Sequence, residues 1–235
     1  MSTVTTIYLL VVYISSMIYF LYTGTKLWHY LQILKNKKIR ALTITCLVFI
    51  CMSLLSLLVA IVESHFIKKG FHILISATEI YLMYQIIDFT LRKSKAKDVI
   101  KLLLCFSAPY LLFSFKFSTD DPRNHFLYAY ISLVLVTASM IYFKQLEQDI
   151  TSIDITKQPE TLLQLGVFFC NTLPLILSCT WISIYLFDQN LATYLAKAND
   201  GNELFKLALS VEGLCYLLLM YFINKSYKWI ILSYT

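Results

Sequence analysis

Residues 99–115 read VIKLLLCFSAPYLLFSF, and this apolar stretch decides how many times the chain can cross a lipid bilayer. A helical run of about 17 to 25 apolar residues is long enough to span the hydrocarbon core. Residues 99–115 form the shortest such run in the chain, and Lys101 and Pro109 interrupt it. If this segment did not span, every later segment would have the opposite orientation.

Six longer apolar runs accompany it. They cover roughly residues 4–28, 41–62, 71–91, 126–143, 161–187 and 204–223. The connections are short, which makes consecutive helices antiparallel neighbours, and the few glycines form no GxxxG pair, so bulky side chains are expected to pack the helices. The sequence therefore predicts an all-α fold, a single polytopic membrane helix bundle of about seven transmembrane helices covering residues 1–235.

The distribution of basic residues indicates that residues 99–115 do span. With seven spans and the N-terminus outside, 14 of the 20 Lys and Arg residues lie in inner segments. Cytoplasmic loops of membrane proteins carry an excess of Lys and Arg, so this bias favours an N-out, C-in orientation. The first run follows MSTVTTI, which contains no Lys or Arg. A cleavable signal peptide would need a positive segment there, so we expect this run to stay in the membrane.

The composition excludes several classes of protein. The chain is 58% hydrophobic and 14% charged, whereas soluble domains are about 25% charged. The net charge of +6 comes from lysines and arginines clustered between apolar runs. These clusters form no broad basic face, so we expect no nucleic-acid partner. We expect them to meet anionic lipid headgroups on the inner side of the bilayer.

Two acidic residues inside the apolar runs are the first candidates for a functional site. Glu79 lies in HILISATEIYLMYQIID and Glu212 in ALSVEGLCYLLLMYF. Ionisable side chains in a bilayer core are costly and therefore mark functional sites by default. In the expected topology both helices enter from outside, which places both carboxyl groups about 10 to 12 Å below the outer edge.

Polar residues on the third and sixth runs extend this candidate site. Tyr81, Tyr84 and Gln85 fall on one helical face with Asp88, while Glu79 projects from nearly the opposite side. The sixth run adds polar side chains around Pro174: Gln164, Asn171, Thr172, Ser178 and Thr180. Three interpretations remain open: interhelical hydrogen bonds that fix packing, a ligand or ion pocket, and a proton relay. We take Glu79, Glu212, Tyr81, Tyr84, Gln85 and Asn171 as the candidate pocket residues.

Enzyme motifs are missing from the sequence. It contains no HExxH, no GxSxG and no Walker loop. His65, His72 and His125 fall at outer helix ends, but none are paired at metal-ligand spacing within one helix. A retinal protein would need a lysine midway along the last helix, whereas Lys225 is at its inner end. We therefore expect a non-enzymatic protein with no catalytic residues, no metal site and no cofactor.

Two stretches carry a family resemblance. GFHILISATEIYLMYQIIDFTLRKSKAKDVIKLLL, residues 70–104, and TKQPETLLQLGVFFCNTLPLILS, residues 156–178, resemble a group of small bacterial seven-helix membrane proteins, common in Bacteroidetes and often encoded beside sensor kinases. In that group the third helix carries a glutamate among aliphatic residues, then an aromatic-rich half and a basic loop. Here those features match Glu79, Tyr81, Tyr84 and residues 92–97.

The resemblance implies a sensory or accessory role in a bacterial inner membrane, with a membrane signalling protein or complex subunit as partner. We expect an outward-facing polar pocket between the third, sixth and seventh helices. Two alternatives are a small cation- or proton-coupled transporter or channel that uses Glu79 and Glu212, and a structural subunit of a larger membrane complex. The transporter interpretation is less favoured, because many transporters contain internal repeats and this sequence shows none.

Overall fold

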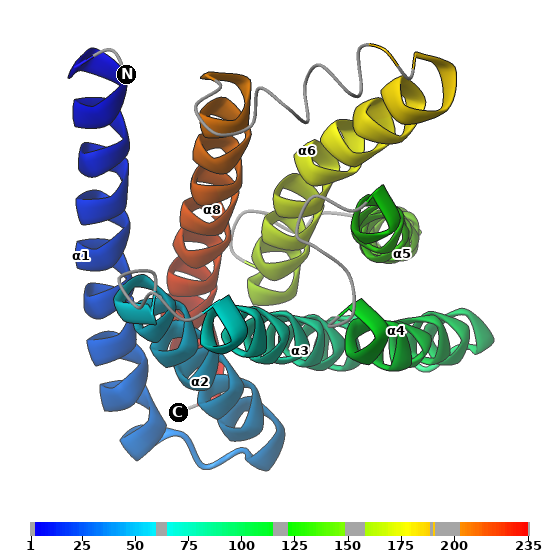
Figure 1. Cartoon of the computed structure of the whole chain (residues 1–235). Helices are drawn as coiled ribbons and strands as arrows, with labels where there is room; N and C mark the ends of the chain where they lie inside the picture. The colour runs from blue at the N-terminus through cyan, green and yellow to red at the C-terminus, as the bar shows by residue number, and fades with distance from the viewer. Residues whose placement is uncertain are drawn as a thin grey trace.

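The computed structural model of the chain is all-α (Figure 1). It describes residues 3–59, 65–114, 122–148, 158–188, 190 and 203–234, with side chains at 11, 14–55, 70–71, 73–107, 109, 126–148, 158–188, 190 and 214–232. Within these ranges the backbone forms seven helices: α1 (Thr3–Ile33), α2 (Lys37–Val59), α3 (His65–Thr90), α4 (Lys95–Ser114), α5 (Pro122–Glu147), α6 (Pro159–Phe187) and α8 (Glu203–Tyr234).

Each of the seven predicted apolar runs coincides with one of these helices. Residues 99–114 of the weakest run form most of α4, which continues through Pro109. The last helix extends well beyond residue 223, because NKSYKWIILSY adds further helical turns to α8. The prediction of an all-α fold is confirmed for the residues that the structure describes.

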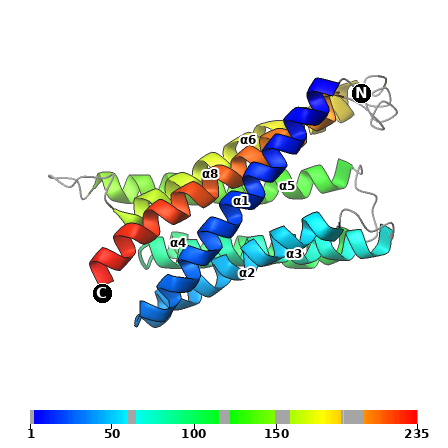
Figure 2. The same cartoon turned by 90° about the vertical axis from the view of Figure 1, so that its left-hand side faces the viewer.

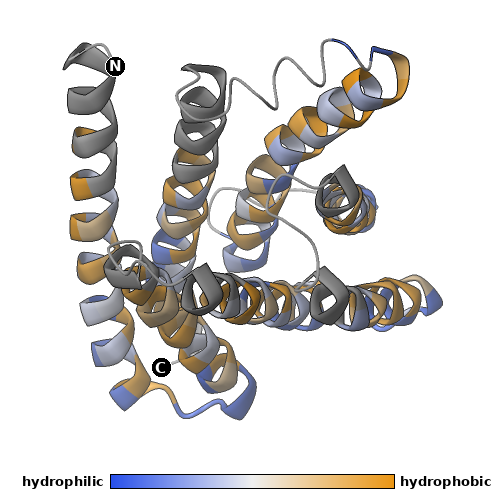
Figure 3. Ribbon diagram, in the orientation of Figure 1, coloured by the Kyte–Doolittle hydropathy of each residue, from blue (hydrophilic) through white to orange (hydrophobic). Residues whose placement is uncertain are grey.

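Three of the helices are long and apolar enough to cross a membrane within the described residues. Their qualifying segments are Lys37–Leu55 of α2, Phe126–Glu147 of α5 and Pro159–Phe187 of α6. Large apolar side chains also face outward on α1 and α4, for example Ile18 and Phe106, each more than 60% exposed. Figure 3 shows apolar residues along the helices and hydrophilic ones at several helix ends. These features are those of a membrane protein.

The helices close into a ring. Each helix from α1 to α6 packs against the next one in the chain, α6 packs against α8, and α8 packs against α1. Helix α3 also contacts α5 and α6 across the ring, so it is the most central element. In Figures 1 and 2, α1 and α8 run side by side with their N-terminal ends at the same end of the molecule. Polar residues on α3 can therefore meet partners from several directions.

Tyr227 of α8 contacts both α1 and α2. Its side chain is fully buried. The Thr43 hydroxyl of α2 donates a hydrogen bond of 3.0 Å to its phenol oxygen, and its ring stacks on Tyr30 of α1 with centroids 6.4 Å apart. The contact joins residues that lie 184 positions apart in the sequence.

One close helix contact depends on a glycine, although the sequence contains no GxxxG pair. Gly166 of α6 is buried, and a Cβ atom placed on it would lie 2.9 Å from the Cβ of Phe222 on α8. Real side chains do not approach that closely, so the spacing of α6 and α8 requires glycine at this position. The expectation that bulky side chains alone pack the helices therefore does not hold at this contact.

Candidate functional site

The polar face of α3 is formed as the spacing indicated. The rings of Tyr81 and Tyr84 stack with centroids 6.4 Å apart, and the Gln85 amide donates a hydrogen bond of 2.8 Å to the Tyr81 phenol. Lys101 of α4 places its ammonium 4.5 Å from the centre of the Tyr84 ring. Tyr81 is about half exposed, at 51%. These residues form one polar surface on α3, continuous with α4.

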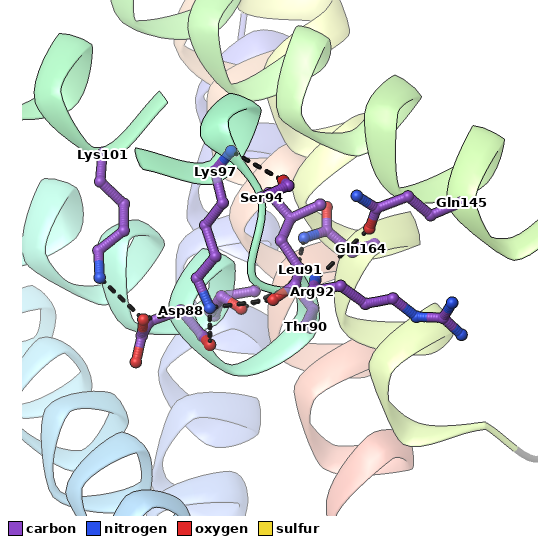
Figure 4. Close-up of polar contacts among 10 residues, drawn as sticks. Asp88, Thr90, Leu91, Arg92, Ser94, Lys97, Lys101, Gln145 and Gln164 are labelled. Carbon is purple, nitrogen blue, oxygen red and sulfur yellow. Dashed lines mark hydrogen bonds and ion pairs between the residues drawn. The ribbon is translucent and has the colours of Figure 1, made fainter. Parts of the chain in front are cut away.

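At the end of this face, Asp88 and two lysines join α3 to α4 (Figure 4). The Lys101 ammonium lies 2.8 Å from the Asp88 carboxylate and the Lys97 ammonium 3.2 Å from it. Lys97 also donates hydrogen bonds to the backbone carbonyls of Asp88 and Leu91, at 2.6 and 2.9 Å. These carbonyls belong to the last turn of α3 or follow it directly, where intrahelical partners are missing. Lys97 therefore caps α3 with a buried positive charge.

Glu79 projects from the other side of α3 and meets α8. The phenol of Tyr216 donates a hydrogen bond of 2.9 Å to the Glu79 carboxyl group. The Tyr216 ring in turn packs against Phe49 of α2, with centroids 5.9 Å apart. A carboxyl group within an apolar helix thus has a neutral hydrogen-bond donor on a helix that is far away in the sequence. No local pattern indicated Tyr216 as this partner.

Of the other two predicted pocket residues, the structure describes the side chain of Asn171 but not that of Glu212. Asn171 is buried on α6, where its amide donates a hydrogen bond to the Val167 carbonyl. Because α6 and α8 meet at Gly166 and Phe222 and run in opposite directions (Figure 1), Asn171 is at about the height of Tyr216. Glu212 precedes Tyr216 by one helical turn, and its side chain is outside the described residues.

Five of the six candidate residues therefore fall into two groups, and the sixth, Glu212, has no described side chain. Tyr81, Tyr84 and Gln85 share the α3–α4 surface. Glu79 faces α8, and Asn171 lies at a similar height on α6. Of the two groups, only the second can line a space between α3, α6 and α8.

A buried chain of hydrogen bonds connects α3, α5 and α6. The sequence did not predict it. The Gln164 amide of α6 donates to Thr90 of α3 at 2.6 Å, and its carbonyl oxygen accepts from Ser139 of α5 at 2.8 Å. Gln164 and Ser139 are fully buried and Thr90 is 7% exposed. Gln164 stood out as a polar residue in an apolar run, but its partners lie 25 and 74 positions away. Each polar group in this network has a partner, as burial requires.

Two surface grooves lie at the edges of the bundle, and the first includes Gln85 and Asp88 of the polar α3 surface. One, of about 200 Å³, is lined by Lys37, Lys38, Ala41, Gln85, Asp88 and Phe89 of α2 and α3. The other, of about 190 Å³, lies between α1 and α8. Its lining residues are Tyr19, Lys26, Tyr30, Tyr221, Asn224, Lys225 and Lys228. The second groove is strongly basic and aromatic.

Comparisons with protein-family models, with curated proteins and with solved structures find no match to this chain. Among the described residues, no group of three His, Cys, Asp or Glu side chains is placed to hold a metal ion. The functional assignment therefore depends on the geometry of the polar contacts.

Proposed function

We propose that this protein is a non-enzymatic sensory or accessory module of a cell membrane, with an ion or small-ligand pocket between α3, α6 and α8. The observation that carries the proposal is the hydrogen bond between Glu79 and Tyr216. A carboxyl group in a bilayer core is costly unless it has a partner or a role. The phenol of Tyr216 is one of its hydrogen-bond partners here, and a carboxyl group at such a position can take up a proton or bind a cation.

The proposed pocket consists of Glu79, Glu212, Asn171 and Tyr216 in the outer half of the bundle. Glu212 is included because the expected topology gives it the same depth as Glu79 in the outer half of the membrane. Two carboxyl groups in a poorly hydrated site repel each other when both are ionised, so they favour sharing a proton or binding a cation. This chemistry makes the contact between α3 and α8 depend on what occupies the pocket.

Helix α3 is suited to carry such a change across the membrane. Asp88 and Thr90 follow Glu79 by two to three helical turns, about 13 to 17 Å along the axis. They bind α4 through Lys97 and Lys101 and α6 through Gln164. A ligand that favours one α3 position at Glu79 would therefore also shift the contacts at the other end. A membrane signalling protein would read that change on the inner side.

The proposal includes seven spans, an outer N-terminus and an inner C-terminus, motivated by the charge distribution. In a cysteine-free background, single cysteines at Ser118 and Ser152 test it with an impermeant thiol reagent on intact cells. We expect labelling at position 118 only, because it lies in an outer loop of the proposed topology, whereas 152 lies in an inner one. Equal labelling at both positions would contradict the orientation.

The pocket is tested by substitutions at Glu79, with the purified protein in lipid nanodiscs. The unfolding midpoint of the wild type is expected to depend on pH and on added Na⁺, K⁺ or Ca²⁺, and Glu79→Gln should remove that dependence while keeping the fold. Glu79→Leu should be less stable than Glu79→Gln, because leucine leaves the Tyr216 phenol without its acceptor.

Two tyrosine-to-phenylalanine substitutions, each removing one hydroxyl group, provide a matched control. Tyr216→Phe should alter the pH and cation response, whereas Tyr81→Phe, on the opposite side of α3, should leave it unchanged. If all four variants respond like the wild type, Glu79 serves packing alone and the pocket is wrong. If proteoliposomes take up cations or protons and this uptake depends on Glu79, the protein is a transporter or channel and the sensory role is wrong.

A further inference from the structure

The groove between α1 and α8 concentrates positive charge. Lys26 of α1 and Lys225 and Lys228 of α8 line it together with Tyr19, Tyr30, Tyr221 and Asn224. No acidic residue occurs in α1. The acidic residues of α8, Glu203 and Glu212, precede Tyr221 by at least nine residues, about 13 Å along the helix. Three ammonium groups thus share a groove to which α1 and α8 supply no carboxylate.

We propose that this groove binds the phosphate of an anionic lipid headgroup. Its polar side chains are those that recognise phosphate: ammonium groups supply charge, while tyrosine hydroxyls and the Asn224 amide supply hydrogen-bond donors. Its volume of about 190 Å³ is several times the roughly 30 Å³ that one water occupies in the liquid. The inference requires only that the helices lie in a bilayer, and it is independent of the sensory role and of the pocket at Glu79.

Contacts with buried residues hold one wall of the groove in position. Tyr30 stacks on Tyr227, which is fully buried and hydrogen-bonded to Thr43. Two of the three lysines also lie near aromatic side chains. The Lys26 ammonium lies 4.4 Å from the centre of the Tyr22 ring, and that of Lys225 lies 3.5 Å from the Tyr221 hydroxyl. A site ordered in advance loses less conformational entropy on binding.

A lipid fits the groove better than a soluble phosphate because of the surface that leads to it. Leu214, Leu218, Tyr221 and Lys225 follow one another along one face of α8 at helical spacing. Leu214, Leu218 and Tyr221 are each more than 40% exposed. An acyl chain can lie along the two leucines while its headgroup reaches the tyrosine and the lysine, the order in which membrane proteins arrange apolar, aromatic and basic residues.

The test compares two variants that each lose three lysines. One carries Lys26→Gln, Lys225→Gln and Lys228→Gln, which removes the charge of the groove. The control carries Lys35→Gln, Lys93→Gln and Lys95→Gln, three exposed lysines that line neither groove. Binding of dioleoylphosphatidylglycerol and of dioleoylphosphatidylcholine to detergent-solubilised protein is followed by native mass spectrometry. Circular dichroism establishes that both variants are folded.

We expect the wild type and the control to bind one phosphatidylglycerol more tightly than phosphatidylcholine. The groove variant should bind phosphatidylglycerol about 100-fold more weakly, since each of the three lysines near an anionic lipid contributes roughly a factor of five. The single substitution Lys225→Gln should weaken it about fivefold. Glu79→Gln should bind like the wild type, which separates this site from the pocket between α3, α6 and α8.

Two results would overturn the proposal. If the groove variant and the control lose phosphatidylglycerol binding equally, binding depends on the overall charge of the protein and there is no defined site in the groove. Stabilisation by inorganic phosphate, lost only in the groove variant and without selective lipid binding, would mean that the groove serves a soluble phosphate.

Discussion

Replacing Gly166 with alanine tests the packing of α6 on α8 most directly. The added methyl group would meet the Cβ of Phe222 at 2.9 Å and a methyl carbon of Leu219 at 3.4 Å. Because the Phe222 Cβ is fixed by the α8 backbone, the two helices must separate to admit the methyl group. Overpacking of this kind costs about 1 to 3 kcal/mol. Alanine regains about 1 kcal/mol through its higher helix propensity, so the net loss should be about 0 to 2 kcal/mol.

Gly24 provides a matched control on α1. An added Cβ there would lie 3.5 Å from the nearest side-chain atom, a methyl carbon of Ile50, which is ordinary van der Waals contact. Gly24→Ala should therefore be neutral or stabilising by up to about 1 kcal/mol. The difference between the two variants isolates the steric cost at α6–α8, about 1 to 3 kcal/mol.

The assay is equilibrium unfolding by sodium dodecyl sulfate in mixed micelles, followed by circular dichroism. The free energies of unfolding of Gly166→Ala, Gly24→Ala and the wild type are compared under one condition. If Gly166→Ala and Gly24→Ala agree within about 0.5 kcal/mol, the usual scatter of additivity, then α6 and α8 are not held at this spacing and the contact at Phe222 is wrong.

Two further pairs of substitutions use the same assay. Thr23 is buried and its hydroxyl lacks a hydrogen-bond partner within the part of the chain that the structure describes, so Thr23→Val should be neutral or stabilising by about 1 kcal/mol. Thr43→Val, which removes hydrogen bonds to Ile39 and Tyr227, should cost about 1 to 2 kcal/mol, and the opposite order would refute this reading. Lys97→Met should cost about 2 kcal/mol, because Lys97 caps α3 with a buried charge. Lys101→Met should cost at most about 1 kcal/mol, since its partner Asp88 is one-third exposed, and equal losses would show that the cap contributes nothing.

The positions of the helices could be predicted because they depend on local properties of the chain. The length of an apolar run and its bounding polar residues are read directly from neighbouring positions. Even residues 99–114, with a lysine and a proline inside, lie in α4, as the apolar run predicts. The shared face of Tyr81, Tyr84 and Gln85 was predictable for the same reason, since helical periodicity alone sets it.

The partners of the polar residues could not be predicted in this way. Which residue Glu79 meets depends on how α3 and α8 are rotated and spaced, and this is decided by apolar packing around the whole ring. Tyr216 lies 137 positions from Glu79, and the contact at Gly166 arises from a single glycine without any repeated motif. The sequence by itself determined seven helices and which of their residues are unusual for an apolar environment. Only the tertiary structure decided which of those residues meet, because packing between helices sets the rotation of each one, and run length and periodicity are the same for every rotation.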